Sequence, residues 1–255
     1  MFDGQKVAVV VPAYREALLI GRMLAGVPAF VDRIFVVDDA SDDATGEVAL
    51  AVPDPRITLV RHPVNQGVGA AIATGYAAAF EAGADVAVVM AGDGQMDPED
   101  LPALLAPITH GRADYAKGNR LAWPGAAGRM PLARFVGNHV LSVLTALATG
   151  LAIQDSQCGY TALSRRAAEV LPLGSLWARY GYPNDLLGQA AALGLRVVDV
   201  PVRPVYGEEK SGIGLRHALF VIPFVLLRVL FRRFASRLGL APAPEPEAAR
   251  LPGAE

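Results

Sequence analysis

The stretch GADVAVVMAGDGQMDPEDL, residues 83–101, decides the fold class of this chain. A short apolar run, DVAVVM from Asp85, is followed by Gly92-Asp93-Gly94-Gln95 and then by Asp97-Pro98. An apolar run without polar alternation is typical of a strand that helices cover on both faces. Aspartate followed by proline is typical of an N-cap and the first residue of a helix. The stretch therefore predicts a buried strand, a polar turn and a helix.

The same unit precedes this stretch three times. The apolar runs VAVVVP, RIFVVDD and ITLVRH begin at Val7, Arg33 and Ile57, and helices are expected to begin near Glu16, Asp42, Gly69 and Pro98, with Ser41 as a further N-cap. This alternation predicts an α/β fold with a Rossmann-like, mostly parallel sheet and helices on both faces. Because ligands bind where the strand carboxyl ends meet the following loops, we expect the polar residues there to form one crevice.

The second half of the chain is less regular. A strand or loop is expected around Asp114 to Arg120 and a strand from Arg196, with helices from about Pro131 to Thr149 and near Asn184 to Leu193.

Composition excludes several classes of protein. The chain has 255 residues, of which 53% are hydrophobic, with one cysteine, Cys158, and four histidines, so neither an internal disulfide nor a Cys/His zinc cage is expected. No basic-then-apolar signal is evident, and the longest uncharged run in the C-terminal region, Ala218 to Leu227, is shorter than a membrane span. We therefore expect neither secretion nor a transmembrane anchor.

Charge is distributed unevenly although the net charge is only -2. Between Arg203 and Arg237 there are seven basic and two acidic residues, which makes this segment strongly cationic. Since the rest of the chain is acidic, we expect no nucleic-acid partner but an anionic ligand or surface near this end.

Glycines at Gly67-Val68-Gly69 resemble part of a dinucleotide-binding turn. The third glycine is replaced by Ile72, and the turn follows the third strand rather than the first, so we expect a tight turn and close helix packing instead. Phosphate-binding loops of the G-x-x-x-x-G-K-[ST] type and nucleophile elbows are absent from the sequence.

Aspartates at two strand ends each allow two interpretations. Asp38 and Asp39 can form an Asx turn, or accept hydrogen bonds from a nucleotide base or ribose. Asp93, between Gly92 and Gly94, can be a turn residue, or hold a divalent cation that bridges diphosphate oxygens.

Taken together, the motifs resemble those of family 2 glycosyltransferases of the GT-A fold, particularly the dolichyl- and polyprenyl-phosphate mannose or glucose synthases. The resemblance covers roughly residues 6 to 215. The matching segments are VVVPAYRE (9–16), VVDDASDDAT (36–45), HPVNQGVGAA (62–71), GADVAVVMAGDGQMDPEDL (83–101), KGNR (117–120), IQDSQCGYTALSR (153–165) and VPVRPVYGEEKSG (200–212).

The resemblance implies roles for individual residues and an inverting, single displacement. The donor nucleotide sugar would be held by Pro12, Tyr14, Glu16, Val37, Asp39 and Gly92, with Asp93 and Gln95 at the diphosphate and a Mg²⁺ or Mn²⁺ ion bound by Asp93. Arg120, Arg134, Arg203 and Lys210 would face donor or acceptor phosphates. The sequence departs from the family pattern in two places. Ala91 replaces the first carboxylate of Asp-x-Asp-x-Gln, and Pro204 and Glu209 replace an arginine and a serine before Lys210.

The acceptor decides whether a catalytic base is required. A lipid phosphate is already anionic near pH 7 and can attack without a base, whereas a sugar hydroxyl needs one. Asp185 is the candidate base, and an N-cap is its structural alternative. Asp155 can likewise accept a sugar hydroxyl or form a turn.

An apolar stripe marks the C-terminal region. It consists of Phe220, Phe224, Leu227, Phe231, Phe234 and Leu238, and predicts either a helix lying in a membrane surface or one docked on protein. We expect a catalytic domain over residues 1–215, this amphipathic helix over 216–240 and a disordered tail over 241–255.

The leading hypothesis is transfer of a hexose from a nucleotide-diphosphate sugar to a polyprenyl phosphate, at the cytoplasmic face of a membrane, by a peripheral enzyme. The sequence is compatible with an oligomer as well as with a monomer. The alternatives are transfer to a soluble sugar or glycan with Asp185 as base, and a non-catalytic nucleotide-binding protein.

Overall fold

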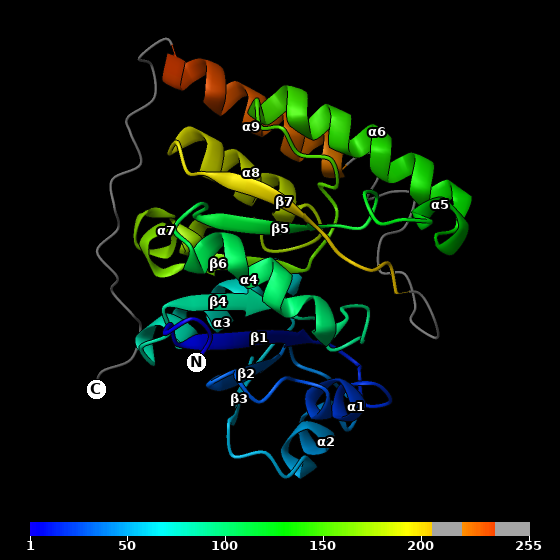
Figure 1. The fold of residues 1–255 in the computed structure, drawn as a ribbon, viewed down its shortest axis with the longest axis vertical. Coiled ribbons are helices and arrows are strands. Elements are labelled where there is room, and N and C mark those ends of the chain that lie inside the picture. Colours follow the sequence, from blue (N-terminus) through cyan, green and yellow to red (C-terminus); the bar gives the residue numbers. More distant parts are fainter. Residues whose placement is uncertain (206–220, 238–255) are drawn as a thin grey trace.

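The computed structural model describes residues 1–205 and 221–237. Seven strands form one sheet in the order β3-β2-β1-β4-β6-β5-β7 (Figure 1). The strands are β1 (Val7–Ala13), β2 (Arg33–Asp38), β3 (Ile57–Arg61), β4 (Val86–Val89), β5 (Tyr115–Asn119), β6 (Thr161–Ser164) and β7 (Val197–Pro201). The α-helices are α1 (Ile20–Ala25), α2 (Thr45–Ala51), α3 (Val68–Glu81), α4 (Leu101–Thr109), α5 (Ala126–Arg129), α6 (Leu132–Thr149), α7 (Arg165–Val170), α8 (Tyr182–Ala192) and α9 (Ile222–Arg237), with 3-10 turns at Pro98–Asp100 and Leu173–Ser175.

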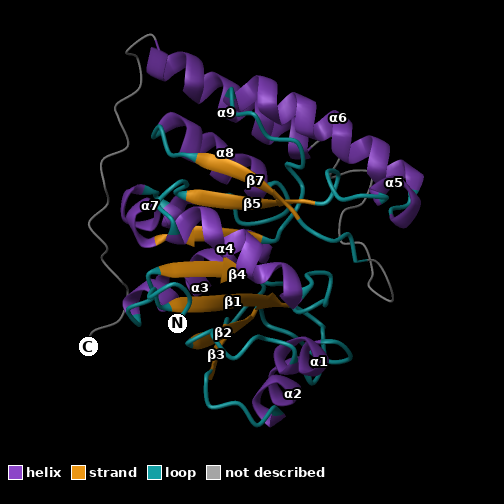
Figure 2. Ribbon diagram, in the orientation of Figure 1, coloured by secondary structure: helices purple, strands orange, loops and turns teal. Residues whose placement is uncertain are grey.

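The sheet is mostly parallel, as the sequence predicts. The pairs β1–β2, β2–β3, β1–β4 and β5–β7 are parallel, and β6 runs antiparallel to both β4 and β5. Helices lie on both faces of the strands (Figure 2). Every residue of β1 is buried, which explains why its sequence shows no polar alternation.

The strands contribute alternate residues to two hydrophobic cores. Val7, Val9 and Val11 pack with residues of α1, α2 and α4, whereas Ala8 and Val10 pack with residues of α3 and α8. Side chains alternate between the two faces of a strand, so a single apolar run serves both cores.

Helix starts differ from expectation at the edge of the sheet. The helices predicted near Glu16 and Asp42 begin later, at Ile20 and Thr45, and the N-cap of α2 is Ala44 rather than Ser41. The Ser41 hydroxyl instead accepts a hydrogen bond from the Arg15 backbone N–H at 3.0 Å, because these residues belong to the loops that follow β1 and β2. Asp97 is confirmed as an N-cap, since its side chain accepts from the Glu99 N–H at 2.9 Å.

The glycines that precede α3 pack against a loop formed by residues 176–181, here called the clasp loop. Backbone N–H groups of Gly69 and Ala70 donate to the Ala178 carbonyl at 2.8 and 3.1 Å. Gly67 has φ of +99°, and a Cβ there would lie 2.5 Å from that carbonyl oxygen. The expected tight turn and close packing are confirmed, and the backbone N–H groups at the start of α3 bind a carbonyl of the protein itself.

Replacing Gly69 with alanine is expected to lower the free energy of unfolding by about 3 kcal/mol. The added methyl group would collide with the Trp177 carbonyl oxygen and lie 2.9 Å from Tyr182 Cβ, so the clasp loop would have to move. Urea denaturation measures the change. Gly128→Ala is the matched control, because nothing lies within 4 Å of a Cβ at that position. Equal stability of the two variants would contradict the close approach.

The C-terminal helix has two apolar faces rather than one. Ile222, Val225, Leu226 and Val229 are buried, and α9 packs on α6 and α8. Most of the predicted stripe points away from this docking: Phe224, Leu227, Phe231 and Phe234 are all exposed, although the Phe224 ring also contacts the Trp177 ring, with centroids 6.0 Å apart. Phe220 and Leu238, and with them the predicted boundary at residue 215 and the predicted tail, lie outside the described residues.

Candidate active site

A cavity of about 840 Å³ lies where the carboxyl ends of β1, β2 and β4 meet the loops that follow them. One side of α6, the clasp loop and the residues after β7 complete its wall. Its volume is within the range of sites for small molecules and cofactors. Of the predicted site residues, those that line it are Pro12, Tyr14, Glu16, Asp39, Gly92, Asp93, Gln95, Arg120, Arg134 and Arg203.

The turn after β4 brings Asp93 to the cavity. One carboxylate oxygen, Oδ1, accepts a hydrogen bond from the Gln95 N–H at 3.0 Å, which is an Asx turn. The turn interpretation of Asp93 is therefore confirmed. The residue also lines the cavity, and its role as a cation ligand stays a prediction. A Cβ on Gly92 would lie 3.5 Å from Ala13 Cβ and from Glu16 Cγ, so this turn packs directly on the end of β1.

Acidic side chains gather at this point. Burial raises the pKa of half-buried Glu16 to about 7, and the nearby charges of Asp93 and Asp43 raise it further. Burial also raises the pKa of Tyr180 in the clasp loop, again with contributions from Asp93 and Glu16. Tyr180 thus lies close enough to the two carboxylates to interact with them electrostatically, and it lines the same cavity.

These residues suit a divalent cation that arrives with a diphosphate. Among the residues that the structure describes, no three His, Cys, Asp or Glu side chains form a metal cluster. Magnesium commonly binds through one or two carboxylates plus substrate phosphates, and Asp93 with Glu16 nearby meets that requirement despite Ala91. The donor set is all oxygen, which fits Mg²⁺ or Mn²⁺.

We expect thermal stability to report the ionisation of Glu16. An acid with a raised pKa in the folded state contributes stability that is complete below its ordinary pKa and is lost as the pH rises through about 7. In metal-free protein, the Tm of the wild type should therefore fall by about 2 °C relative to Glu16→Gln between pH 6 and pH 8. Differential scanning calorimetry in the presence of EDTA measures both. If Tm changed with pH in the same way in the wild type and in Glu16→Gln, Glu16 would not titrate in this range.

Asp39 is buried and is hydrogen-bonded to the loop that follows β3. Its carboxylate accepts from the His62 Nδ1–H at 2.7 Å and from the backbone N–H groups of Gln66 and Gly67 at 2.8 and 2.7 Å. A carboxylate has about four acceptor positions, so one remains for a nucleotide hydroxyl or amine. Val37, the neighbouring predicted residue, is fully buried in β2 and is not part of the cavity wall.

Arg120 is held at the cavity by a buried carboxylate. Its Nε and Nη2 donate to the two oxygens of Asp155 at 2.8 and 3.0 Å, and its backbone N–H donates at 3.0 Å. Asp155 has no exposed surface, and burial acts to raise its pKa, but the Arg120 pair outweighs burial and holds it below the usual range. Fully buried Lys117 lies in the same network and donates to the Cys158 carbonyl. Asp155 therefore positions Arg120, and it also forms the predicted turn, since its Oδ1 accepts from the Gln157 N–H at 3.3 Å.

The other predicted cations differ in their surroundings. Arg134 lies in the first turn of α6 and lines the cavity. Arg203 also lines it, but its guanidinium pairs with Asp97 at 2.9 Å and with Glu99, and its backbone N–H donates to Asp100 at 2.6 Å. Three carboxylates, Asp97, Glu99 and Asp100, thus surround Arg203, whereas Arg120 shares the carboxylate of Asp155 with Lys117. Arg203 is therefore better suited to anchoring the Pro98–Asp100 turn than to binding phosphate. Lys210 lies outside the described residues.

Asp185 does not reach the cavity wall. It lies in the first turn of α8, which begins at Tyr182, so it is not an N-cap. Its fully buried carboxylate accepts from Trp177 N at 3.0 Å, Gln189 Nε2 at 3.0 Å and Arg232 Nη1 at 3.3 Å. It thereby links the clasp loop, α8 and α9.

Tyr180, Asn138 and Gln157 line the cavity although the sequence analysis did not select them. Gln157 stands in the quoted segment 153–165 and could have been found there. Tyr180 and Asn138 carry no such signal, because only the folding of the clasp loop and α6 over the strand ends brings them in.

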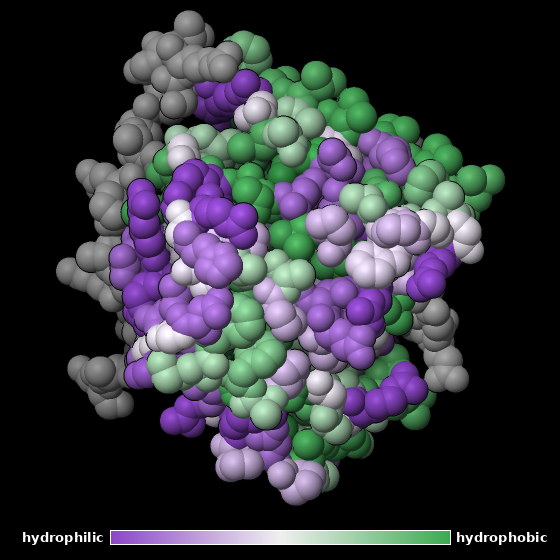
Figure 3. All heavy atoms as spheres, in the orientation of Figure 1, coloured by the Kyte–Doolittle hydropathy of each residue, from purple (hydrophilic) through white to green (hydrophobic). Residues whose placement is uncertain are grey.

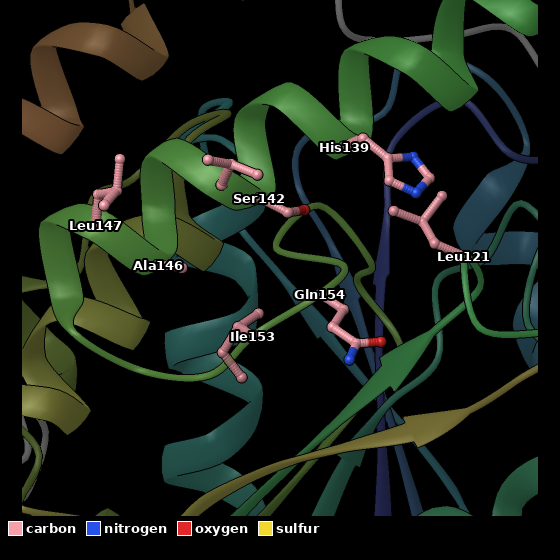
Figure 4. A pocket seen from close by; sticks show the side chains of 8 residues that line it. Leu121, His139, Ser142, Ala146, Leu147, Ile153 and Gln154 are labelled. Carbon is pink, nitrogen blue, oxygen red and sulfur yellow. The ribbon is translucent and has the colours of Figure 1, made fainter.

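A second cavity, of about 440 Å³, lies on another side of α6 (Figure 4). His139, Ser142, Ala146 and Leu147 of α6 face Leu121, Ile153 and Gln154 across it. Its wall is mainly apolar and includes none of the predicted site residues.

Comparison with known proteins shows which family the chain belongs to. Residues 8–171 match the model of the family described as glycosyl transferase family 2. The chain is 32% identical over 214 residues to the UDP-N-acetylglucosamine--dolichyl-phosphate N-acetylglucosaminyltransferase of Methanococcus voltae, covering 78% of this chain and 85% of the relative. It is also 32% identical over 220 residues to the undecaprenyl-phosphate mannosyltransferase of Micrococcus luteus, covering 82% and 89%.

Solved structures share the fold at lower sequence identity. Glucosyl-3-phosphoglycerate synthase from Mycobacterium tuberculosis, in complex with phosphoglyceric acid, superposes with a TM-score of 0.70 at 22% identity over 89% of this chain and 81% of that one. The same enzyme in complex with Mn²⁺, UDP and glucosyl-3-phosphoglycerate gives a TM-score of 0.65 at 22% identity, covering 94% and 82%.

Proposed function

This chain belongs to glycosyl transferase family 2, and we propose that it transfers a hexose from a nucleotide-diphosphate sugar to a polyprenyl phosphate, with inversion at the anomeric carbon. The two relatives named above are a dolichyl-phosphate and an undecaprenyl-phosphate transferase, which supports a lipid phosphate as the acceptor. We place the reaction at the cytoplasmic face of a membrane, with the protein bound peripherally.

The observation that carries the proposal is one cavity that joins acidic and cationic groups. Glu16 and Asp93 lie at its strand-end wall, and Arg120 and Arg134 contribute to the rest. A sugar diphosphate needs neutralisation at its phosphates and room for the sugar beyond them. A lipid phosphate needs a cationic group next to the sugar carbon. The cavity offers these surroundings in one place.

The chemistry follows from these groups. Asp93, assisted by Glu16, would hold Mg²⁺ or Mn²⁺, which neutralises charge on the diphosphate leaving group. Asp39 would accept a hydrogen bond from the nucleoside. Arg120, kept in place by Asp155, would orient the acceptor phosphate, whose oxygen attacks the anomeric carbon as the bond to the diphosphate breaks. The phosphate is already anionic, so this route requires no protein base.

The position of Asp185 favours a phosphate acceptor over a hydroxyl. We expect Asp185→Asn to lower kcat by less than about fivefold, whereas loss of a general base costs about 10²- to 10⁴-fold. Because the variant weakens the Arg232 and Trp177 contacts of a buried carboxylate, its melting temperature should fall even though turnover survives. Turnover per folded molecule, with circular dichroism as the measure of folding, separates the two effects. A thousandfold loss in well-folded protein would restore the hydroxyl-acceptor alternative.

Direct assay of transfer tests the proposal. Purified protein, Mg²⁺ or Mn²⁺ and radiolabelled GDP- and UDP-sugars are incubated with polyprenyl phosphate in detergent, and the organic phase is counted. We expect lipid-linked sugar with at least one donor. Transfer to soluble sugars or glycans in the absence of any lipid-linked product would overturn the choice of acceptor.

A further inference from the structure

Helix α6 exposes an apolar face that the sequence analysis did not single out. Leu132, Val136, Val140, Val143, Leu144 and Leu147 are between 43% and 74% exposed. At about 100° per residue, these positions fall on one side of the helix. From Phe135 to Gln154 the sequence contains no charged residue, so nothing on α6 beyond its first turn offsets this face. In the space-filling view, hydrophobic residues gather along the edge of the molecule where α6 lies (Figure 3).

Helix α9 adds a second exposed apolar face beside it. The two helices pack together, and Phe224, Leu227, Phe231 and Phe234 of α9 are 54% to 75% exposed. Ten large apolar side chains on neighbouring helices exceed what a soluble monomer normally exposes in one region. Their exposure therefore indicates that something covers them.

We propose that α6 and α9 together form a surface that docks onto a lipid bilayer, with both helices lying in the plane of the membrane. This inference rests on the proposed lipid-phosphate acceptor and names the part of the protein that meets the lipid. The sequence alone suggested α9 for this role, and the structure adds α6 as an equal part of the surface.

The neighbouring faces of α6 explain why it lies along the membrane rather than across it. By length and composition it is the one helix among residues 1–205 and 221–237 that could span a bilayer, with 22% of it buried in the protein. Yet Thr145 and Ser142 are buried against Asn184 and Ser156, with hydrogen bonds of 2.7 and 2.9 Å. A helix bonded along one side to the catalytic domain can offer lipid only its opposite side.

The same helix joins the docking surface to the active site. Arg134, Gly137, Asn138 and Leu141 line the active-site cavity, and Val136 and Val140 alternate with them in sequence on the exposed face. A lipid phosphate at the membrane surface would thus be separated from the active site by little more than the width of α6. The apolar cavity in Figure 4 adjoins the same exposed face, sharing Val143 and Leu147 with it.

Charge at the margin of this surface favours a bilayer over a second copy of the chain. Arg228 follows Phe224 by four residues, so it lies about 40° around α9 from that edge of the apolar face, with its guanidinium over the Trp177 ring at 5.8 Å. Arg232 lies about 40° further round, where it also pairs with Asp185 at 3.3 Å. Arg129 is exposed just before α6. Arginines bordering an apolar face match anionic lipid headgroups above an apolar interior. In a dimer formed through the same two helices they would meet no acidic partner from them, because neither α6 nor α9 contains Asp or Glu.

Vesicle co-sedimentation tests the proposal. The full chain is mixed with vesicles of phosphatidylcholine, with and without phosphatidylglycerol, that contain no polyprenyl phosphate. We expect binding that is stronger with phosphatidylglycerol, and a loss of at least about tenfold in the Val140→Glu/Phe231→Glu variant. Leu50→Glu/Val170→Glu is the matched control, because it places the same charges at exposed apolar positions on α2 and α7 and should bind like wild type.

Two further measurements separate the possible outcomes. Val140 and Phe231 lie outside the active-site wall, so the double variant should transfer sugar to a soluble short-chain prenyl phosphate within about threefold of wild type. Vesicle binding without transfer to any prenyl phosphate would refute the proposed function and leave the docking surface standing. The docking proposal would be overturned if the wild-type protein did not co-sediment with vesicles. It would also be overturned if light scattering detected a wild-type dimer that was absent in the double variant.

Discussion

Replacing Asp93 with asparagine is expected to reduce sugar transfer by about a thousandfold. The amide oxygen can still accept the 3.0 Å hydrogen bond from the Gln95 N–H, so the turn after β4 should survive. What disappears is the carboxylate charge at the point of the cavity where the diphosphate is proposed to leave. Donor binding in the presence of Mn²⁺, measured by calorimetry, should weaken together with kcat.

The control for Asp93→Asn is Glu169→Gln. Glu169 is exposed on α7, and this substitution removes the same charge away from the cavity, so turnover should stay within about twofold of wild type. An Asp93→Asn enzyme that keeps more than a tenth of wild-type activity would show that the leaving group is neutralised elsewhere. Arg120 and Arg134 would then be the residues to test next.

Replacing Asp155 with asparagine is expected to reduce stability and activity together. The substitution leaves Arg120, whose side chain is only 16% exposed, without its counter-charge, and removes a neighbouring negative charge from buried Lys117. Breaking a buried ion pair on one side costs about 3 kcal/mol or more in the free energy of unfolding. Because Arg120 would no longer be held in position, turnover per folded molecule should fall about a hundredfold.

The Asp114–Arg196 pair provides the control for Asp155. Buried Asp114 accepts two hydrogen bonds from the Arg196 guanidinium, at 2.9 and 3.0 Å, at the opposite end of β5. Asp114→Asn should therefore lower the unfolding free energy measured in urea while leaving turnover per folded molecule unchanged. If both variants lose activity in proportion to stability, Asp155 has no positioning role.

Acid denaturation independently measures how much the ionised Asp155 carboxylate stabilises the folded state. Burial acts to raise its pKa, but the Arg120 pair holds it below the ordinary value. Such a group stabilises the folded state above its ordinary pKa, and this contribution is lost as the pH falls through the lower, folded-state pKa. The wild type should therefore lose stability more steeply than Asp155→Asn below about pH 4.

Several elements could be predicted because their causes are local. The four N-terminal strands follow from apolar runs, and the Asp97 N-cap follows from a side chain that bonds its own backbone two residues on. Helices α1 and α2 begin later than predicted, and Arg15 and Ala40, just before the predicted starts, adopt left-handed backbone angles, φ of +59° and +60°, in the loops that form the edge of the cavity. Such conformations are costly for non-glycine residues and are imposed by the surrounding loops rather than by local preference.

The amino-acid sequence by itself determined the order of strands and helices, the polar strand ends and the acidic turn at Asp93, since each depends on residues close together in the chain. Only the tertiary structure decided which of these groups share a cavity. It joined Asp155 to Arg120, took Asp185 out of the cavity wall and turned the predicted stripe of α9 outward beside the apolar face of α6. The physical reason is that burial and pairing depend on which surfaces pack together. A helix with apolar residues on two sides buries the side whose shape fits its neighbours, and its periodicity alone does not say which side that is.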